Sequence, residues 1–260
     1  MDRRRESPVH HVMSEIRFFQ LSDAGRVRHW PHEDGLVFAV ADGVGDDAGG
    51  EVASALALDV IGREMDRAPG SWPVAKRLRR AVQEANLEIY NKAITVPDLR
   101  GMATTLTASA VIGGTLVAAH VGDCRLFLLR DGRLTQITKD HTWVWEQVEH
   151  GALSAGDARV HARRRMLTRS VGRELIVGID LLTLAVRADD VLLQCSDGVH
   201  GGLAEPELAE LLSAHPPEAA CRALIRRARE EGGEDHVSAQ VAAVVSCPPR
   251  SAWPWWRFGL

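Results

Sequence analysis

Short apolar runs and helically spaced apolar positions divide the chain into strands and helices. Apolar runs that end at glycine or aspartate predict strands buried in a sheet. They cover residues 16–21, 36–41, 105–112, 115–121, 124–129, 133–137, 181–186, 191–195 and 237–245. Helical spacing predicts helices over about 50–67, 73–94, 205–213 and 217–231. Residues 26–35 show neither pattern, and we expect a short loop there before the strand at 36–41.

Turn dipeptides indicate how the strands are connected. Gly113–Gly114 and Asp131–Gly132 each fall between two predicted strands. Such dipeptides are strong hairpin signals, and a hairpin joins antiparallel neighbours. With helix pairs flanking these strands, the sequence predicts an α+β sandwich of two mainly antiparallel sheets rather than a doubly wound parallel sheet.

Three stretches differ from the rest of the chain. Residues 1–14 are polar and rich in arginine and histidine, and we expect a flexible N-terminus there. Residues 141–173 hold short, charged, helix-compatible pieces, as expected of a small surface subdomain within a main domain over 15–246. Residues 247–260 carry three of the seven tryptophans among prolines. This tail is expected either to bind a partner or to pack on the domain's own surface.

The composition argues against several classes of protein. The 260 residues are 45% hydrophobic and 25% charged, which is typical of a globular protein. A net charge of -4 and a pI near 6.3 do not favour a nucleic-acid partner. The four cysteines lack paired spacing, which argues against a disulfide scaffold or zinc ribbon. No signal peptide and no apolar run near the ~20 residues of a membrane helix are evident. We expect a cytoplasmic monomer.

Four aspartates follow apolar runs or lie in glycine-flanked turns: Asp42, Asp123, Asp197 and Asp235. Clustered carboxylates raise one another's pKa, and divalent cations remove that repulsion. Oxygen ligands suit magnesium or manganese rather than zinc. Two such ions ~3.5–4 Å apart can activate a water molecule for attack on phosphorus. Each aspartate alone is better explained by helix capping or a turn, but four together favour a metal site.

Other patterns that suggest phosphate chemistry are weaker. Residues 43–48 fit a glycine-rich nucleotide fingerprint, but the acidic residues there would repel a pyrophosphate. Cys124 and Arg130 have the spacing of cysteine-based phosphatases, but the bulky residues between them predict a strand. His141, His161 and His236 are each candidates for protonating a leaving group, and the sequence singles out none of them.

Together, the ordered motifs resemble the bacterial metal-dependent type 2C protein serine/threonine phosphatases, from about Ile16 to Val245. The matching segments are 22–28, 40–45, 49–54, 101–106, 121–125, 129–132, 139–141, 167–172, 193–198 and 233–237. The chain departs from the family in a shorter loop after Arg28 and in Asp46–Asp47, where the family commonly has Gly-His. So many segments in one order make the resemblance specific.

The resemblance implies an α-β-β-α sandwich with a centre of two Mg²⁺ or Mn²⁺ ions between the sheets. Asp42 would bridge both ions, and the Gly43 carbonyl would bind one of them. Asp197 and Asp235 would complete the shell of the other ion. Asp123 would help to hold a weaker third ion.

The resemblance also implies a substrate and a function. Arg28 would bind the substrate phosphate, and residues 141–173 would form a flap beside the active site. The protein would be a bacterial hydrolase of signal transduction that removes phosphate from phosphoserine and phosphothreonine in proteins, opposing a serine/threonine kinase. The alternative is a catalytically weak phosphatase-like scaffold that binds phosphopeptides.

Overall fold

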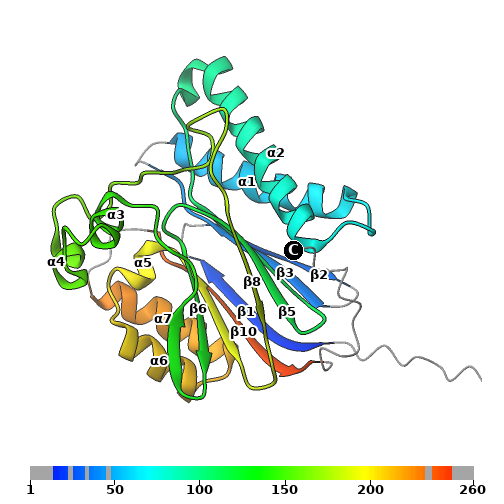
Figure 1. Ribbon diagram of the computed structural model, residues 1–260, viewed down its shortest axis with the longest axis vertical. Helices are drawn as coiled ribbons and strands as arrows, with labels where there is room; N and C mark the ends of the chain where they lie inside the picture. Colours follow the sequence, from blue (N-terminus) through cyan, green and yellow to red (C-terminus); the bar gives the residue numbers. More distant parts are fainter. Residues whose placement is uncertain (1–13, 23–25, 33–34, 45–47, 232–235, 248–260) are drawn as a thin grey trace, which may run out of the picture.

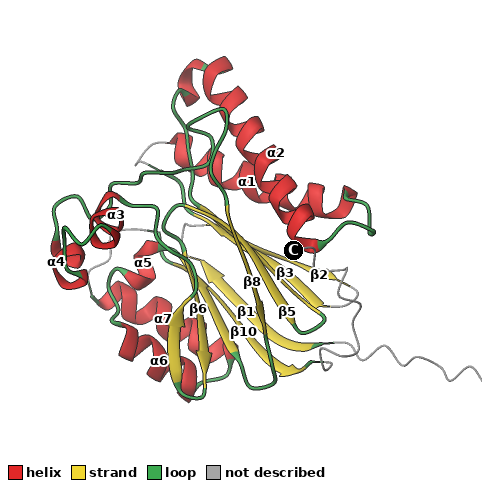
Figure 2. Cartoon of the chain, viewed as in Figure 1, coloured by secondary structure: helices red, strands yellow, loops and turns green. Residues whose placement is uncertain are grey.

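The computed structural model describes residues 14–22, 26–32, 35–44, 48–231 and 236–247. Two five-stranded sheets pack face to face, and helices cover the outer surface of each sheet (Figure 1). The layers therefore run helix, sheet, sheet, helix (Figure 2), which confirms the predicted α+β sandwich.

All neighbouring strands in both sheets are antiparallel. The first sheet has the order β1 (Glu15–Ser22), β10 (Ser238–Ser246), β9 (Val191–Cys195), β6 (Arg125–Arg130) and β7 (Arg133–Gln136). The second sheet has the order β2 (Arg26–His32), β3 (Gly35–Ala41), β4 (Leu106–Ile112), β5 (Thr115–Val121) and β8 (Asp180–Ala185). The hairpins predicted at Gly113–Gly114 and Asp131–Gly132 join β4 to β5 and β6 to β7.

The helices fall into two outer layers and one peripheral group. Helices α1 (Ala48–Arg67) and α2 (Val74–Thr95) cover the second sheet, and a 3-10 turn, η1 (Pro97–Leu99), follows them. Helices α5 (Asp197–His200), α6 (Glu205–Ala214) and α7 (Pro217–Glu230) cover the first sheet. Helices α3 (Trp143–Glu149) and α4 (Ala155–Val160) lie to one side, within the predicted flap segment (Figure 1).

Side-chain alternation along the strands produces three apolar layers. In β3, Val37 and Ala39 pack against α1 and α2, whereas Leu36 and Phe38 face the opposite sheet. A strand buried on both faces needs a continuous apolar run, which is why β3 was recognisable in the sequence. Most of the side chains between the two sheets are apolar, but the buried amides of Gln194 and Gln240 also lie there.

The expectation of a loop over residues 26–35 was wrong for most of that segment. Strand β2 pairs with β3 from Arg26 opposite Ala41 to His32 opposite Gly35. It is an edge strand, so Pro31 removes no hydrogen bond that a second neighbour would need. An edge strand is paired on one side only and is less buried than a central strand. The mostly polar, partly exposed residues of β2 therefore show no apolar pattern that predicts a strand.

Two predicted segments lie almost entirely outside the described residues. These are the N-terminal segment 1–14, except Ser14, and the tail 247–260, except Cys247. Within the described ranges, no helix combines the length and the hydropathy needed to cross a membrane.

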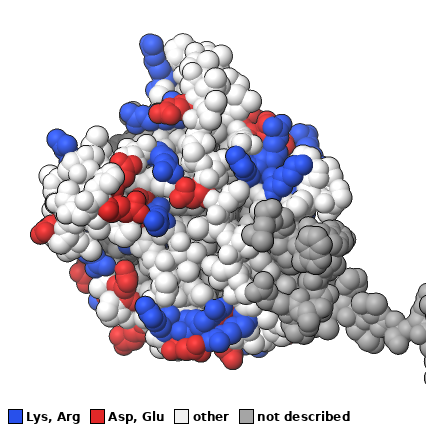
Figure 3. All heavy atoms as spheres, in the orientation of Figure 1, with Lys and Arg blue, Asp and Glu red and all other residues white. Residues whose placement is uncertain are grey.

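Charged side chains on the face seen in Figure 3 are interleaved in sign. Arg130 forms an ion pair with the buried Asp190, and Arg187 pairs with Asp131. Opposite charges that lie this close cancel over short distances, so these two ion pairs carry little net charge.

Candidate metal centre

Asp42 is the first residue after β3, and its backbone is fixed by the start of β4. The Asp42 carbonyl accepts hydrogen bonds from the Thr105 N–H and from the Thr104 hydroxyl, each at 2.8 Å. The Asp42 N–H in turn donates to Thr105 Oγ1 at 3.2 Å. At Gly43, an added Cβ would lie 2.4 Å from the Gly50 carbonyl oxygen, so only glycine fits against the start of α1. The Asp42–Gly43 segment is therefore rigidly placed.

Asp123 lies in the turn between β5 and β6, at the same end of the sandwich. Gly122 has φ +107°, and an added Cβ there would lie 2.6 Å from the Thr105 Cβ, so the tight turn requires glycine. The Asp123 carbonyl accepts a hydrogen bond from His200 Nε2 at 2.9 Å. His200 ends α5, the short helix that begins at Asp197. This contact brings the Asp123 turn against the helix that carries Asp197.

The carboxyl groups of Asp123 and Asp197 interact directly through their charges. Burial, followed by repulsion from Asp197, raises the pKa of Asp123 to about 8. Asp140 adds to this repulsion, and Arg125 opposes it. Arg125 does not neutralise Asp123, however, because its Nε and Nη2 both donate to Asp140, at 3.0 and 2.7 Å.

Cys124 shows that Asp42 belongs to the same acidic region. Its thiol is fully buried, and burial raises the pKa of Cys124 well above its usual range. The negative charges of Asp42, Asp123 and Asp197 all raise that pKa further. Three half-buried carboxylates from different segments of the chain thus lie in one region. That donor set fits a divalent cation, which would remove their mutual repulsion.

The fourth predicted aspartate, Asp235, lies outside the described residues. Its neighbour His236 is described, with Nδ1 at 4.0 Å from Asp42 Oδ1 and a side chain that is 44% exposed. Gly198 packs on the His236 carbonyl, where an added Cβ would lie 2.7 Å from the oxygen. Among the described residues, no three His, Cys, Asp or Glu side chains are placed to enclose one metal ion.

Arg28 lies on β2 opposite Ala39, whose side chain faces the helix layer. Its guanidinium forms an ion pair with Asp59 of α1, and both side chains are about half exposed. The guanidinium therefore faces α1 rather than the space between the sheets. The phosphate-binding role of Arg28 stays a prediction that this arrangement does not support.

The flap segment is anchored directly beside Asp123. His141 accepts a hydrogen bond from the Gly122 N–H through Nδ1 at 3.0 Å, and its own N–H donates to the Gly122 carbonyl at 2.8 Å. Burial, followed by the charge of Arg169, lowers the pKa of His141. Because Nδ1 is an acceptor here, the imidazole is neutral. Sequence reasoning treated His141 as a possible proton donor and missed this anchoring role.

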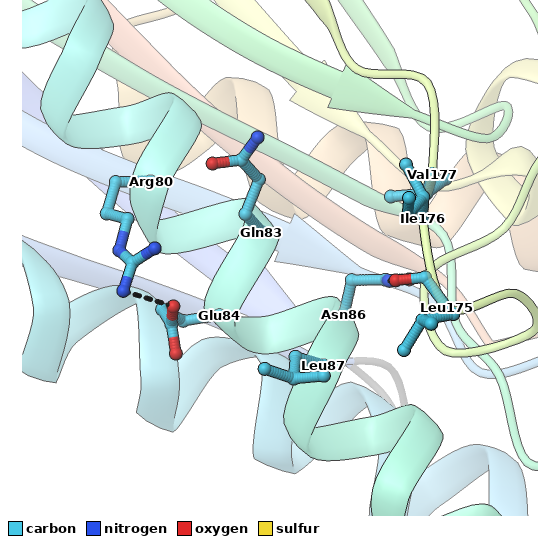
Figure 4. Close-up of a pocket in the computed structure, with 8 residues that line it drawn as sticks. All are labelled: Arg80, Gln83, Glu84, Asn86, Leu87, Leu175, Ile176 and Val177. Carbon is cyan, nitrogen blue, oxygen red and sulfur yellow. Dashed lines mark hydrogen bonds and ion pairs between the residues drawn. The ribbon is translucent and has the colours of Figure 1, made fainter.

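A shallow cavity of about 210 Å³ lies elsewhere, between α2 and the segment that precedes β8 (Figure 4). Its charged lining residues, Arg80 and Glu84, form an ion pair at 2.6 Å. Asn86 donates to the carbonyls of Glu174 and Leu175, which ties the segment to α2. The residues that line this cavity include none of the three described site aspartates and no cluster of acids, so the metal centre is the stronger candidate.

Comparison with known proteins agrees with this geometry. The sequence profile of the family described as Protein phosphatase 2C matches residues 20–245. The chain belongs to this family. The family predicted from the sequence motifs is thereby confirmed, and so is the predicted sandwich fold.

Bacterial relatives match most of this phosphatase 2C chain. The serine/threonine protein phosphatase PstP of Mycobacterium tuberculosis is 39% identical over 236 residues, which are 88% of this chain. The chain spans only 45% of the length of that relative. The serine/threonine phosphatase stp of Listeria monocytogenes is 35% identical over 230 residues, which are 84% of this chain and 91% of that protein.

Solved structures include the catalytic domain of PstP in complex with two manganese ions. It has a TM-score of 0.78 and 34% sequence identity, and the match covers 89% of this chain and 99% of that one. This phosphatase 2C chain thus shares its fold with a structure that holds two manganese ions.

Proposed function

We propose that this chain is a Mg²⁺- or Mn²⁺-dependent phosphatase that hydrolyses phosphoserine and phosphothreonine in proteins. The carrying observation is the contact of the half-buried Asp123 turn with α5, the helix that begins at Asp197, since a cation there would remove the repulsion that raises the pKa of Asp123. Membership of the Protein phosphatase 2C family and the two manganese ions of the PstP catalytic domain support the same conclusion.

We assign the metal ligands to residues at the ends of strands. Asp42 and the Gly43 carbonyl, with Asp197 and Asp235, would hold two divalent ions, and Asp123 would help to hold a third. Bound ions of this kind lower the pKa of a water molecule and stabilise negative charge on phosphoryl oxygens. The chain's own contribution is rigid placement, because the backbone of Asp42 is fixed by Thr104 and Thr105.

The substrate would be a phosphorylated protein, modified by a serine/threonine kinase, that approaches the open end of the sandwich. Residues 141–173 would act as a flap beside it, since His141 is bonded to Gly122 and the Thr168 N–H donates to the His141 carbonyl. We propose a single catalytic domain over 15–246 that acts as a monomer. Its tail, 247–260, would be available to a partner.

A cytoplasmic location is part of the same proposal, and the cysteines support it. Cys124, Cys195, Cys221 and Cys247 are all free thiols, and the first three are buried. Free thiols are typical of a reducing compartment.

Turnover of a phosphothreonine peptide tests the function. We expect hydrolysis that requires added Mn²⁺ or Mg²⁺ and stops when a chelator is added. Binding of the peptide without turnover, in the presence of excess Mn²⁺, would instead identify a phosphopeptide-binding scaffold and reject the enzymatic proposal.

A further inference from the structure

Buried amide side chains connect the two sheets just below the acidic region. Ser109 Oγ donates to Gln194 Oε1 at 2.6 Å, and Gln194 Nε2 donates to the Thr107 carbonyl at 2.9 Å and to Gln240 Oε1 at 3.1 Å. Gln240 Nε2 donates to Gln20 Oε1 at 3.0 Å and to the Arg28 carbonyl at 2.9 Å. We call Ser109, Gln194, Gln240 and Gln20 the amide seam.

The amide seam crosses from one sheet to the other. Gln20, Gln194 and Gln240 belong to β1, β9 and β10 of the first sheet. Their partners Ser109 and Thr107 on β4, and Arg28 on β2, belong to the second sheet. The NH₂ groups of Gln194 and Gln240 each make two hydrogen bonds, so both donors of each group are satisfied.

Stability alone does not account for amides at this depth. Ser109, Gln194 and Gln240 are completely buried, and apolar side chains of similar shape at paired positions can be equally stable there. Hydrogen bonds differ from apolar contacts in direction, because they weaken when donor and acceptor shift. The hydrogen bonds of the amide seam therefore fix the spacing and the alignment of the two sheets. The apolar contacts between the sheets fix them less precisely.

The seam lies next to the segments that carry the acidic side chains. Gln194 is three positions before Asp197 on the same chain segment. Thr107 pairs with Val40, which is two positions before Asp42. The Thr107 hydroxyl oxygen also lies 3.0 Å from the carbonyl oxygen of Cys124, the residue directly after Asp123. Through the contacts of Gln194 and Thr107, the amide seam is connected to the segments that carry Asp42, Asp123 and Asp197.

We propose that the amide seam positions the metal ligands, with Gln194 as the central positioning residue. Bonds from Gln194 and Gln240 to the second sheet set the distance between Asp42 and Asp197, which lie just after β3 and β9, strands of opposite sheets. Small divalent ions bind well only when their oxygen ligands are correctly spaced, so the seam sets the metal affinity. This inference rests on the proposed function, because it assumes that these aspartates share divalent ions.

The test compares Mn²⁺ binding by two variants of the intact chain. Gln194→Met keeps the length of the side chain and removes its hydrogen bonds. Leu192→Val is the matched control, because Leu192 is fully buried two positions earlier on β9, in the apolar layer between the sheets. Isothermal titration calorimetry with Mn²⁺ gives the affinity, and thermal unfolding of the metal-free proteins gives the stability.

We expect Gln194→Met to weaken Mn²⁺ binding about tenfold or more, as loss of a group that orients metal ligands typically does. Leu192→Val should bind Mn²⁺ within about twofold of the unmodified chain, although it too lowers the melting temperature. Ser109→Ala removes a single bond of the seam, and it should weaken binding in the same direction if Gln194→Met does not fold.

Unchanged Mn²⁺ affinity in the folded seam variants, or an equal loss in Leu192→Val, would overturn the proposal. The unmodified chain tests the proposed function separately from the role of the amide seam. An unmodified chain that binds Mn²⁺ but hydrolyses no phosphopeptide rejects the enzyme, while the affinity comparison still decides the role of the seam. An unmodified chain that binds no Mn²⁺ rejects both.

Discussion

Asp123 is half-buried beside Asp197, and desolvation followed by repulsion from Asp197 raises the pKa of Asp123 to about 8. The usual pKa of an aspartate is near 3.9. Between these two values the folded metal-free protein holds a proton that the unfolded chain has released. Stability of the metal-free protein therefore falls as pH rises from about 4 to 8.

Asp123→Asn should remove this pH dependence. We expect the metal-free variant to be more stable than the unmodified chain at pH 8, with a smaller difference at pH 5, because the amide cannot ionise. Thermal unfolding in the presence of a chelator measures both. A variant that is less stable at pH 8 would show that the carboxylate is neutralised in some other way.

Asp42→Asn and Asp235→Asn should abolish hydrolysis of a generic aryl phosphate while the fold is retained. The amide is neutral and a poorer ligand for a hard cation, so the two-metal arrangement would be lost. Asp131→Asn is the matched control, because Asp131 lies at an exposed hairpin turn and pairs with Arg187. Initial rates at saturating Mn²⁺ give the comparison, and near-normal rates for either site variant would refute the assignment.

His120 should make the protein sensitive to acid. Burial, followed by the charge of His141, lowers the pKa of His120 to about 4, whereas an unfolded histidine titrates near 6.5. The unfolded chain therefore gains a proton first as pH falls, and stability is lost below about pH 6.5. The loss between pH 7 and pH 5 is about 2 kcal/mol for this group.

Urea unfolding at pH 7 and pH 5 measures this loss, and His120→Gln should reduce it. Glutamine keeps polar atoms near the Thr107 hydroxyl and the Lys139 carbonyl, which the imidazole contacts at 2.9 and 3.0 Å. An identical pH dependence in His120→Gln would mean that other groups cause the loss.

Arg28 gives a direct test of substrate binding. Its ion pair with Asp59 is about half exposed, and such pairs contribute at most about 1 kcal/mol, so a substrate phosphate could displace Asp59. If Arg28 binds the phosphate, Arg28→Ala raises KM several-fold and Asp59→Asn leaves KM unchanged or lower. Steady-state kinetics with a phosphothreonine peptide decide this, and an unchanged KM in Arg28→Ala would remove Arg28 from the site.

The central part of the fold was predictable because it rests on strong local patterns. A continuous apolar run that stops at Asp42 reveals both a buried strand and the residue at its edge. The Asp131–Gly132 turn likewise marked its hairpin, since both residues have positive φ. The motifs shared with the family then predicted which aspartates of these segments bind metal ions.

The remaining features depend on contacts that the sequence does not display. Strand β2 was missed because an edge strand with Pro31 needs neither alternation nor a full ladder of bonds. Helix α5 is a single turn that begins at Asp197, too short to show helical spacing. Gln194 occupies one polar position in an apolar strand, and only the opposite sheet shows that it has partners there.

Diffraction from crystals soaked in Mn²⁺, with anomalous differences to locate the metal, tests the central claim most directly. The account predicts two strong peaks between the sheets, with the Asp42 carboxylate bonded to both and with Asp197 and Asp235 bonded to one of them. Ordered carboxyl groups of these three residues with no Mn²⁺ between them would contradict it.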